Sequence, residues 1–136
     1  MRRGMTSRNL IRVASLMALL LTVGVAADAQ RGYWQSLGTA HVDGGRDHDR
    51  IRVNARGSFT GLQLGIKGGE IDFQRVVVHF ENGGEQELAI RERIPDRGKT
   101  RPIDLNGERR RIESIEFWYS KPSWRSRPRV QAWGRR

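Results

Sequence analysis

Cysteine is absent from the sequence, and this absence excludes several kinds of protein at once. No disulfide can link distant parts of the chain, so the core has to come from ordinary apolar burial. Thiol catalysis and cysteine-based metal sites are excluded for the same reason. Lysine is scarce as well, because only Lys67, Lys99 and Lys121 among 25 basic residues are lysines. We interpret this arginine bias as genomic base composition rather than as a functional choice.

Acidic residues are absent from the start of the chain, where Asp28 is the first to occur. The basic residues there are Arg2, Arg3, Arg8 and Arg12. An uncharged, largely apolar stretch follows at residues 13–27. Its length of about fifteen residues is typical of a secretory signal peptide and is short of the about twenty residues that span a membrane. We therefore expect residues 1–29 to be a signal peptide, and the protein to be periplasmic or secreted.

Small residues mark the predicted cleavage site. Ala27 and Ala29 occupy alternate positions, which predicts cleavage after Ala29 and a mature chain that starts at Gln30. Cleavage after Ala27 is the second choice. No cysteine follows, which excludes lipid attachment at this site. A twin-arginine signal, suggested by Arg2-Arg3, and an uncleaved anchor are two less favoured interpretations of the same segment.

The remaining residues, 30–136, suffice for a single compact domain. Its charge is unevenly distributed along the sequence. Residues 30–108 contain twelve basic and twelve acidic side chains. Residues 109–136 contain nine basic side chains and only two acids, Glu113 and Glu116. The net positive charge of the domain therefore lies in its last quarter.

No stretch after residue 30 has the apolar stripe of an amphipathic helix, and the apolar residues recur instead with a period close to two. This alternation predicts strands with one buried face. The predicted strands are 33–42, 51–53, 62–66, 76–80, 88–90, 103–105, 115–119 and 129–133. Eight such short strands favour an all-β fold, a two-sheet antiparallel sandwich or jelly roll, over a barrel.

Glycine-rich turn signals separate the predicted strands. Asn82-Gly83-Gly84 predicts a tight hairpin across residues 80–88, because its glycines can adopt the positive φ values that such a turn needs. A change in the phase of the apolar residues predicts a β-bulge near Gln74 and Arg75. Residues 121–129, which include two prolines, are predicted to be a loop.

The basic C-terminal quarter is the main candidate binding surface. Guanidinium groups pair with phosphate, sulfate or carboxylate, and indole rings stack on sugars or bases. The candidate ligand-binding residues are Arg109, Arg110, Arg111, Trp118, Trp124, Arg125, Arg127 and Arg129. In the alternative interpretation Phe117, Tyr119 and Trp133 belong to the core, and the arginines form a solvated face.

Asp43, Asp47 and Asp49 are weak candidates for a metal site, together with His41 and His48. Their spacing matches no calcium-loop pattern, and aspartate is an ordinary turn residue. We therefore predict no metal site and no other cofactor.

The candidate catalytic residues do not combine into a known catalytic set. Ser58 directly follows a glycine and so misses its place in a G-x-S-x-G motif. His79 has no carboxylate partner near it in the sequence, and Glu85 and Glu87 flank an exposed turn. We therefore predict that the protein is not an enzyme.

Short motifs run through nearly all of the predicted domain. They are Trp34, Leu37-Gly38, Val42-Asp43, Asp47-x-Asp49-x-Ile51-x-Val53, Phe59-x-x-Leu62, Asn82-Gly83, Ile103-Asp104-Leu105 and Ile115-x-Phe117-Trp118-Tyr119. With these motifs the chain resembles small exported bacterial proteins classed as a domain of unknown function. The run from Ile103 to Phe117 is also similar to the last strands of galactose-binding-like jelly rolls. Both resemblances imply an all-β fold, and neither implies an activity or site residues.

We hypothesise an exported, non-enzymatic binding module that associates with an anionic component of the cell envelope. The component is an acidic glycan, a lipid head group or an acidic protein. Nucleic acid is an unsuitable partner, because an exported protein meets little of it. One rival hypothesis is a protein-interaction or self-association domain. A second rival is a metal-dependent hydrolase that uses Asp43, Asp47, Asp49 and His48.

Overall fold

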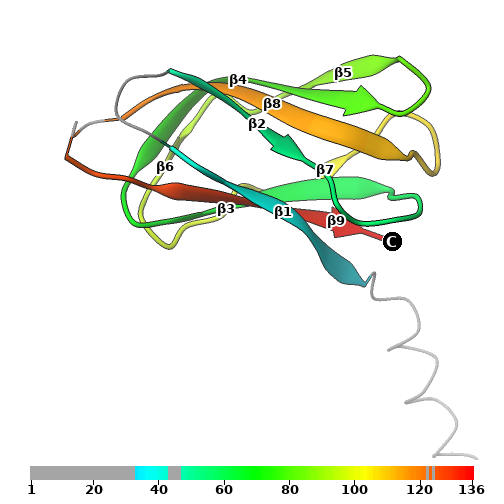
Figure 1. The fold of residues 1–136 in the computed structure, drawn as a ribbon, viewed down its shortest axis with the longest axis horizontal. Coiled ribbons are helices and arrows are strands. Elements are labelled where there is room, and N and C mark those ends of the chain that lie inside the picture. Colours follow the sequence, from blue (N-terminus) through cyan, green and yellow to red (C-terminus); the bar gives the residue numbers. More distant parts are fainter. Residues whose placement is uncertain (1–32, 43–46, 122, 124) are drawn as a thin grey trace, which may run out of the picture. The chain divides into compact units, whose positions relative to one another are not determined.

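A computed structural model describes residues 33–42, 47–121, 123 and 125–136 of the chain. The strands are β1 (Trp34–His41), β2 (His48–Arg52), β3 (Gly61–Lys67), β4 (Ile71–Phe80), β5 (Glu85–Leu88), β6 (Arg93–Ile94), β7 (Ile103–Asp104), β8 (Ile112–Ser120) and β9 (Arg129–Arg135). These nine strands lie in two layers (Figure 1). The described residues contain no helix with the length and apolar character needed to cross a membrane.

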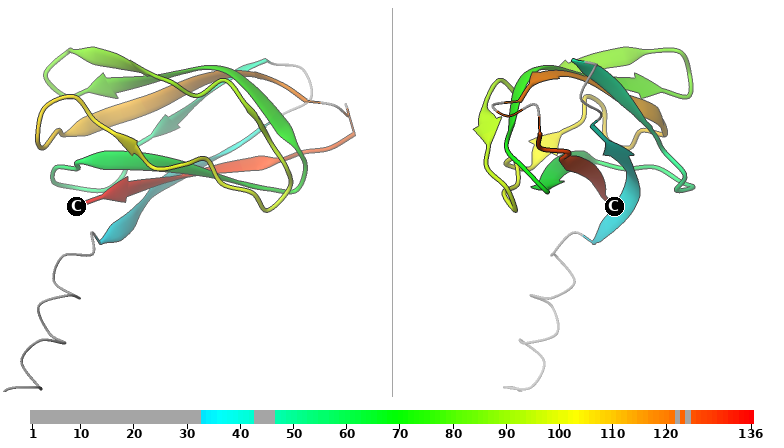
Figure 2. Two further views of the ribbon diagram at one scale, coloured as in Figure 1. Left: turned by 180° about the vertical axis from the view of Figure 1, so that it is seen from behind. Right: turned by 60° about the vertical axis from the view of Figure 1, so that its left-hand side comes forward.

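Two antiparallel sheets form the layers. One sheet has four strands in the order β1-β9-β3-β7. The other has five strands in the order β2-β8-β4-β5, with β6 pairing to the remaining part of β4. Figure 2 shows the two sheets stacked face to face from two further directions. The predicted two-sheet antiparallel sandwich is therefore confirmed.

Seven of the eight predicted strands are present, the one predicted at residues 88–90 overlaps β5 only at Leu88, and the described residues contain one strand more than predicted. The additional strand is β6, whose two residues are too few to show an alternation in the sequence. The predicted bulge is confirmed, because the register of β4 against β8 shifts between Phe73 and Arg75. The predicted hairpin is confirmed as well: the amide of Phe80 donates to the carbonyl of Gly84 at 2.8 Å, and Gly83 adopts a φ of +89°.

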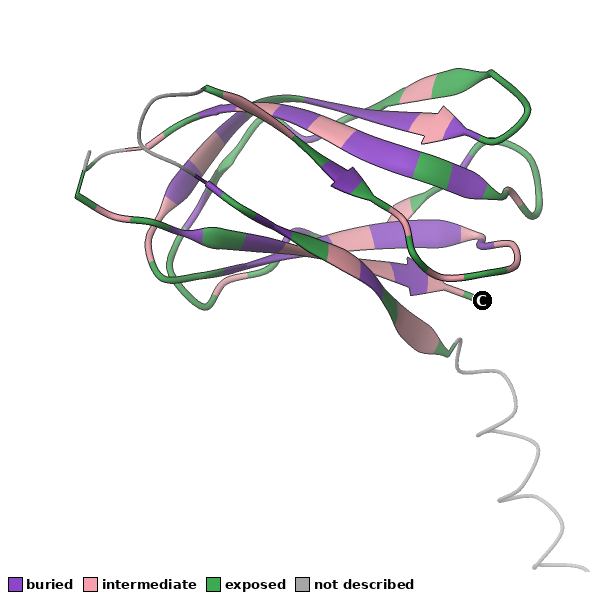
Figure 3. Cartoon of the chain, viewed as in Figure 1, coloured by how far each residue is buried: buried purple, intermediate pink, exposed green. Residues whose placement is uncertain are grey.

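Apolar residues from alternate positions of both sheets fill the space between them, as the purple bands in Figure 3 show. The largest of these buried side chains are Tyr119, Phe59, Phe73, Phe80 and Phe117. Phe73 and Phe117 meet edge to face, with ring centroids 5.9 Å apart. Phe117 and Tyr119 thus lie in the core, as the alternative interpretation of the C-terminal quarter predicted. Trp133 does not, because it is only partly buried.

The predicted signal peptide, its cleavage site and two candidate residues, Asp43 and Trp124, lie outside the described residues. The predicted loop at residues 121–129 is described except for two positions, 122 and 124. It connects β8 to β9 and thereby joins the two sheets.

Gly134 of β9 marks the tightest packing between a strand backbone and the core. A Cβ atom at this position would lie 2.6 Å from Cδ1 of Phe59 and 3.0 Å from Cδ2 of Leu37. We expect Gly134→Ala to lower the free energy of unfolding by about 1–3 kcal/mol, because the buried ring has to move. Urea denaturation measures the change.

Gly65 of β3 offers the matched control, because it is a strand glycine in the same sheet. A Cβ atom there would lie 3.6 Å from Cγ of Lys99, which is an ordinary contact distance. We expect Gly65→Ala to change the free energy of unfolding by less than about 0.5 kcal/mol. Equal effects of the two substitutions would contradict this packing.

Candidate functional site

The structure distributes the predicted ligand-binding residues over separate parts of the domain. Trp118 lies on β8 in the five-stranded sheet, whereas Arg129 lies on β9 in the four-stranded sheet. Arg109–Arg111 precede β8 near the β4–β5 hairpin, and Arg125 and Arg127 lie in the loop before β9. The residues that are described therefore do not form the single surface that the sequence predicted, because the two sheets carry their outer faces on opposite sides.

Trp118 has its ring contacts within the domain. The register pairs it with His48 of β2 on one side and with Arg75 of β4 on the other. The His48 ring stacks on the indole at a centroid distance of 4.6 Å, and the Arg75 guanidinium lies 4.9 Å from the indole centroid. The side chains of His48 and Arg75 thus contact the indole ring that was predicted to stack against a ligand.

Glu116 lies one outward position before Trp118 on β8 and is the centre of a charge network. Its carboxylate oxygens lie 2.7 Å from Nε2 of His48, 3.0 Å from Nη2 of Arg50 and 3.0 Å from Nε2 of His79. Burial raises the pKa of Glu116, but the hydrogen bonds from His79, Arg50 and His48 outweigh this effect and lower the pKa to about 2. Glu116 is therefore held as an anion.

Two further acids complete this network on the five-stranded sheet. Glu85 lies 3.5 Å from Nδ1 of His79, and Glu87 lies 3.4 Å from Nε of Arg75. The structure thus supplies His79 with the carboxylate partners that its sequence neighbourhood lacked. They come from β5 and β8, which only the folded sheet brings next to β4. The charges on this face compensate one another.

The weak metal candidates engage other groups. Asp49 accepts a hydrogen bond of 2.8 Å from the hydroxyl of the buried Tyr119, and His48 contacts Glu116. Asp47 is exposed, and its carbonyl accepts from the amide of Tyr119 at 2.9 Å. Within the described part of the chain, no three histidine, aspartate or glutamate side chains are grouped as metal ligands.

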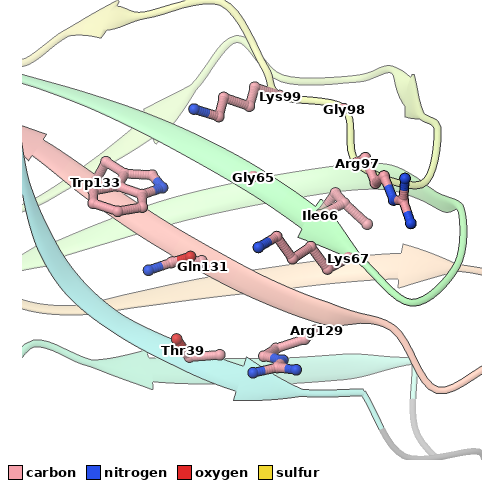
Figure 4. Close-up of a pocket in the computed structure, with 10 residues that line it drawn as sticks. All are labelled: Thr39, Gly65, Ile66, Lys67, Arg97, Gly98, Lys99, Arg129, Gln131 and Trp133. Atoms are coloured by element: carbon pink, nitrogen blue, oxygen red, sulfur yellow. The ribbon is translucent and has the colours of Figure 1, made fainter.

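A pocket of about 270 Å³ opens on the outer face of the four-stranded sheet (Figure 4). Strands β1, β3 and β9 and the loop before β7 contribute its lining residues, which are Thr39, Gly65, Ile66, Lys67, Arg97, Gly98, Lys99, Arg129, Gln131 and Trp133. Figure 4 shows Trp133 and Gln131 on β9, between the loop that carries Arg97 and Lys99 on one side and Thr39 of β1 on the other. We call this pocket the cationic groove.

Sheet geometry explains why these side chains meet. Residues two apart on a strand point to the same face, so Arg129, Gln131 and Trp133 alternate with the buried Val130 and Ala132. On the neighbouring β3, Gly65 is paired with Gln131 and has no side chain. This gap on β3 leaves room beside the indole of Trp133.

The loop that forms the second wall is fixed to the edge of β3 by hydrogen bonds. The amide of Ile66 donates to the carbonyl of Gly98 at 2.9 Å, and the amide of Arg97 donates to the carbonyl of Ile66 at 2.9 Å. The buried Thr100 exchanges further bonds with Leu64, one of them through its hydroxyl at 3.0 Å. The wall is therefore preorganised by the sheet.

The four cations of the groove gather around one pocket without an acidic partner. Lys67, Arg97, Lys99 and Arg129 form no ion pair with any acid in the part of the chain that the structure describes. No acidic residue lines the groove. The acid of the adjacent turn, Asp96, instead accepts a hydrogen bond of 2.8 Å from the amide of Gly68. Four like charges around one pocket without a counter-charge favour an anionic ligand.

The backbone conformation of Arg97 is a second observation that favours a functional role for this residue. Its φ of +66° makes it the one non-glycine residue with a positive φ in the described chain. Such a conformation costs an arginine about 1–3 kcal/mol and is found where the surrounding structure enforces it, often at ligand sites. The turn therefore places a cation at the groove where a glycine would be less strained.

Of this site, only Arg129 was predicted from the sequence. Lys67 and Lys99 carry a weak signal, since two of the three lysines in an arginine-biased chain line the same pocket. Trp133 is in phase with Arg129 on a predicted strand, which also places it on the outer face. The contribution of Arg97 depends on the path of its loop along β3, which no local pattern reveals.

A family model described as a domain of unknown function, DUF2541, matches residues 14–134. Among curated proteins, none matches the sequence. Solved structures show a likeness of fold. The chain is similar to AlgX of Pseudomonas aeruginosa, with a TM-score of 0.51 and 12% identity over 75% of this chain and 26% of that one. The domain thus spans about a quarter of AlgX.

Two further solved structures align with lower TM-scores. A mutant of a family 29 carbohydrate binding module aligns with a TM-score of 0.41 and 13% identity over 77% of this chain and 92% of that one. A chain of infectious bursal disease virus, Gx strain, aligns with a TM-score of 0.37 and 13% identity over 77% of this chain and 32% of that one.

The Glu116 network predicts a pH dependence of stability. The pKa of Glu116 falls from 4.5 to about 2 on folding, so its contribution is fully present above pH 4.5 and is lost as the pH falls through about 2. We expect the difference in free energy of unfolding between the native protein and Glu116→Gln to shrink over this interval. Urea titrations at a series of pH values measure it, and a constant difference would contradict the network.

Proposed function

The chain belongs to the DUF2541 family, a domain of unknown function, and we propose from its own surface that it is an exported, non-enzymatic module that binds an acidic glycan of the cell envelope. The observation that carries this proposal is the cationic groove, which four cations without an acidic partner line together with one indole. Export rests on the signal-peptide pattern of residues 1–29.

The chemistry of the groove suits an acidic sugar chain. An indole ring packs against the apolar face of a sugar ring, while amide and hydroxyl groups such as those of Gln131 and Thr39 bond to its hydroxyls. The cations of Lys67, Lys99 and Arg129 supply the attraction for its carboxylate or sulfate groups. Lysine provides a compact charge without the geometric demands of a guanidinium fork, which fits repeated anionic groups on a flexible chain.

Two rival anionic partners fit this surface less well. Lipid surfaces are bound by apolar side chains that insert beside the head groups, and protein partners by apolar anchors that fill pockets. Among the described residues the large hydrophobic residue with an exposed side chain is Tyr33, which does not line the groove. The groove has four cations and one aromatic ring, and no large exposed hydrophobic side chain of the described residues lies around it.

A binding role is favoured over hydrolysis by the residue types that line the groove. Glycoside hydrolysis uses a pair of carboxylic acids on either side of the scissile bond. The lining offers cations, an amide, a hydroxyl and an indole, and none of its residues is acidic. Such a set can hold a sugar chain and has no group to act as general acid or nucleophile.

Binding to acidic oligosaccharides tests the proposal. We expect hexagalacturonate or heparin fragments to bind the protein and neutral maltohexaose not to bind. We expect Lys67→Ala/Lys99→Ala and Trp133→Ala each to weaken binding about tenfold or more, a loss of about 1.4 kcal/mol. Isothermal titration calorimetry at two salt concentrations measures both effects, and the charge variant is expected to show the smaller salt dependence.

Two matched variants control for charge and for loss of an indole. Arg52→Ala/Arg91→Ala removes two exposed cations outside the groove, and Trp118→Ala removes the indole of the other sheet. Both are expected to keep native affinity. Binding to neither acidic probe, or equal losses in the groove variants and the controls, would overturn the proposal.

Two substitutions of Arg97 test its role in binding separately from its effect on stability. Arg97→Gly and Arg97→Ala both remove the cation, so we expect the same several-fold loss of affinity in each. Glycine relieves the positive φ of 66°, while alanine keeps the strain. Only Arg97→Gly is therefore expected to raise the free energy of unfolding, by up to about 1 kcal/mol. Native affinity in both variants would remove Arg97 from the site.

A further inference from the structure

Arg109, Arg110 and Arg111 form a second group of cations that the cationic groove does not use. All three line a hollow of about 360 Å³ at the end of the sandwich, together with Phe80, Glu81 and Asn82. The hollow lies between the tip of the β4–β5 hairpin and the segment that leads into β8. We call it the arginine hollow.

Arg110 fixes the position of this segment. Its backbone exchanges two hydrogen bonds of 2.9 Å with Phe59. Its guanidinium lies 3.7 Å from the ring centroid of Phe80, and Nη1 donates to the carbonyl of Asn106 at 3.0 Å. Arg110 is thus held by contacts within the domain and gives its neighbours a rigid base.

Arg109 and Arg111 are the outward-facing members of the group. Both side chains are exposed, and within the described residues neither guanidinium forms a hydrogen bond or an ion pair. Glu81 lines the same hollow, so its three arginines and one carboxylate leave a net charge of +2. Because Arg109 and Arg111 are two residues apart, their Cα atoms lie at most about 7 Å from each other. They can hold two anionic groups of one ligand.

The register of β3 places this hollow far from the cationic groove. Lys67 of the groove is at one end of β3, and Gly61 is at the other, beyond which Phe59 bridges to Arg110. Six residue steps of a strand span about 20 Å. In Figure 1 the β4–β5 hairpin and the end of β9 lie at the right, whereas β9, whose first residue is Arg129, starts at the left.

An ion pair separates the two cationic regions. Arg135 of β9 and Asp104 of β7 both pair in register with Gly61, between the groove and the hollow. The guanidinium of Arg135 contacts the carboxylate of Asp104, whose side chain is 84% exposed. The two charges of this pair cancel, so it offers an acidic chain no net attraction between the groove and the hollow. The two cationic regions are therefore separate.

We propose that the arginine hollow is a second binding site for acidic glycans, so that one domain cross-links two chains. This inference rests on the proposed function, because it takes the groove as the first site. The cross-linking itself follows from the positions of the two sites at opposite ends of β3.

Stoichiometry tests the second site. Trigalacturonate is short, and at trimer concentrations too low to fill a site weakened about tenfold we expect calorimetry to give two trimers per native domain, and one trimer for Arg109→Ala/Arg111→Ala and for Lys67→Ala/Lys99→Ala. Arg52→Ala/Arg91→Ala serves as the charge-matched control with two trimers. One trimer per native domain, or two in the Arg109→Ala/Arg111→Ala variant, would overturn the inference and leave the groove standing. No binding by the native domain would overturn the proposed function, and the inference with it.

Light scattering tests the cross-linking. We expect the native domain to assemble polygalacturonate into particles several-fold larger in hydrodynamic radius than the polymer alone. The two site variants are expected to bind the polymer without enlarging the particles, and Arg52→Ala/Arg91→Ala to behave like the native domain. Particles from Arg109→Ala/Arg111→Ala as large as those from the native domain would overturn the inference, because the cross-links would then not need the hollow.

Discussion

The pairing of β9 with both β1 and β3 is the constraint on which the rest of the structure depends. It places the last strand of the chain inside the four-stranded sheet, where Val130 and Ala132 close the core. The same alternation turns Arg129, Gln131 and Trp133 outward. The same register of β9 therefore completes the core and forms the groove. A shift of β9 by one residue would exchange its inward and outward faces and abolish both.

The two outer faces show how differently the same kinds of side chain can be used. On the five-stranded sheet, Trp118 lies between His48 and Arg75, and the charges of that face are matched by Glu116 and its neighbours. On the four-stranded sheet, the ammonium group of Lys99 lies near the ring of Trp133, at 5.9 Å. Cations that are paired with acids stabilise the fold, whereas the cations of the groove, which have no acidic partner among the described residues, keep their electrostatic attraction for a ligand.

The fold could be predicted from the sequence because its signals are local. Alternation along single strands predicted seven of the nine in the described residues, and it correctly turned Ile115, Phe117 and Tyr119 inward. The site was harder to predict from the sequence, because its residues come together only through the order of the strands in the sheet. Arg129 and Trp118 are close in the sequence, yet they belong to different sheets. Whether a cation has an acidic partner is likewise a property of strand order, as His79 and its partner Glu116 show.

The groove over β3 and β9 is proposed to hold an acidic glycan, and NMR tests this most directly. The measurement is a titration of the isotope-labelled protein with hexagalacturonate, followed by chemical shifts. We expect the largest shifts at the indole N–H of Trp133 and at the amides of Gly65, Lys67 and Lys99, with little change at Trp118. Shifts centred on Trp118 and His48, or spread evenly over all exposed arginines, would contradict a glycan site in the groove.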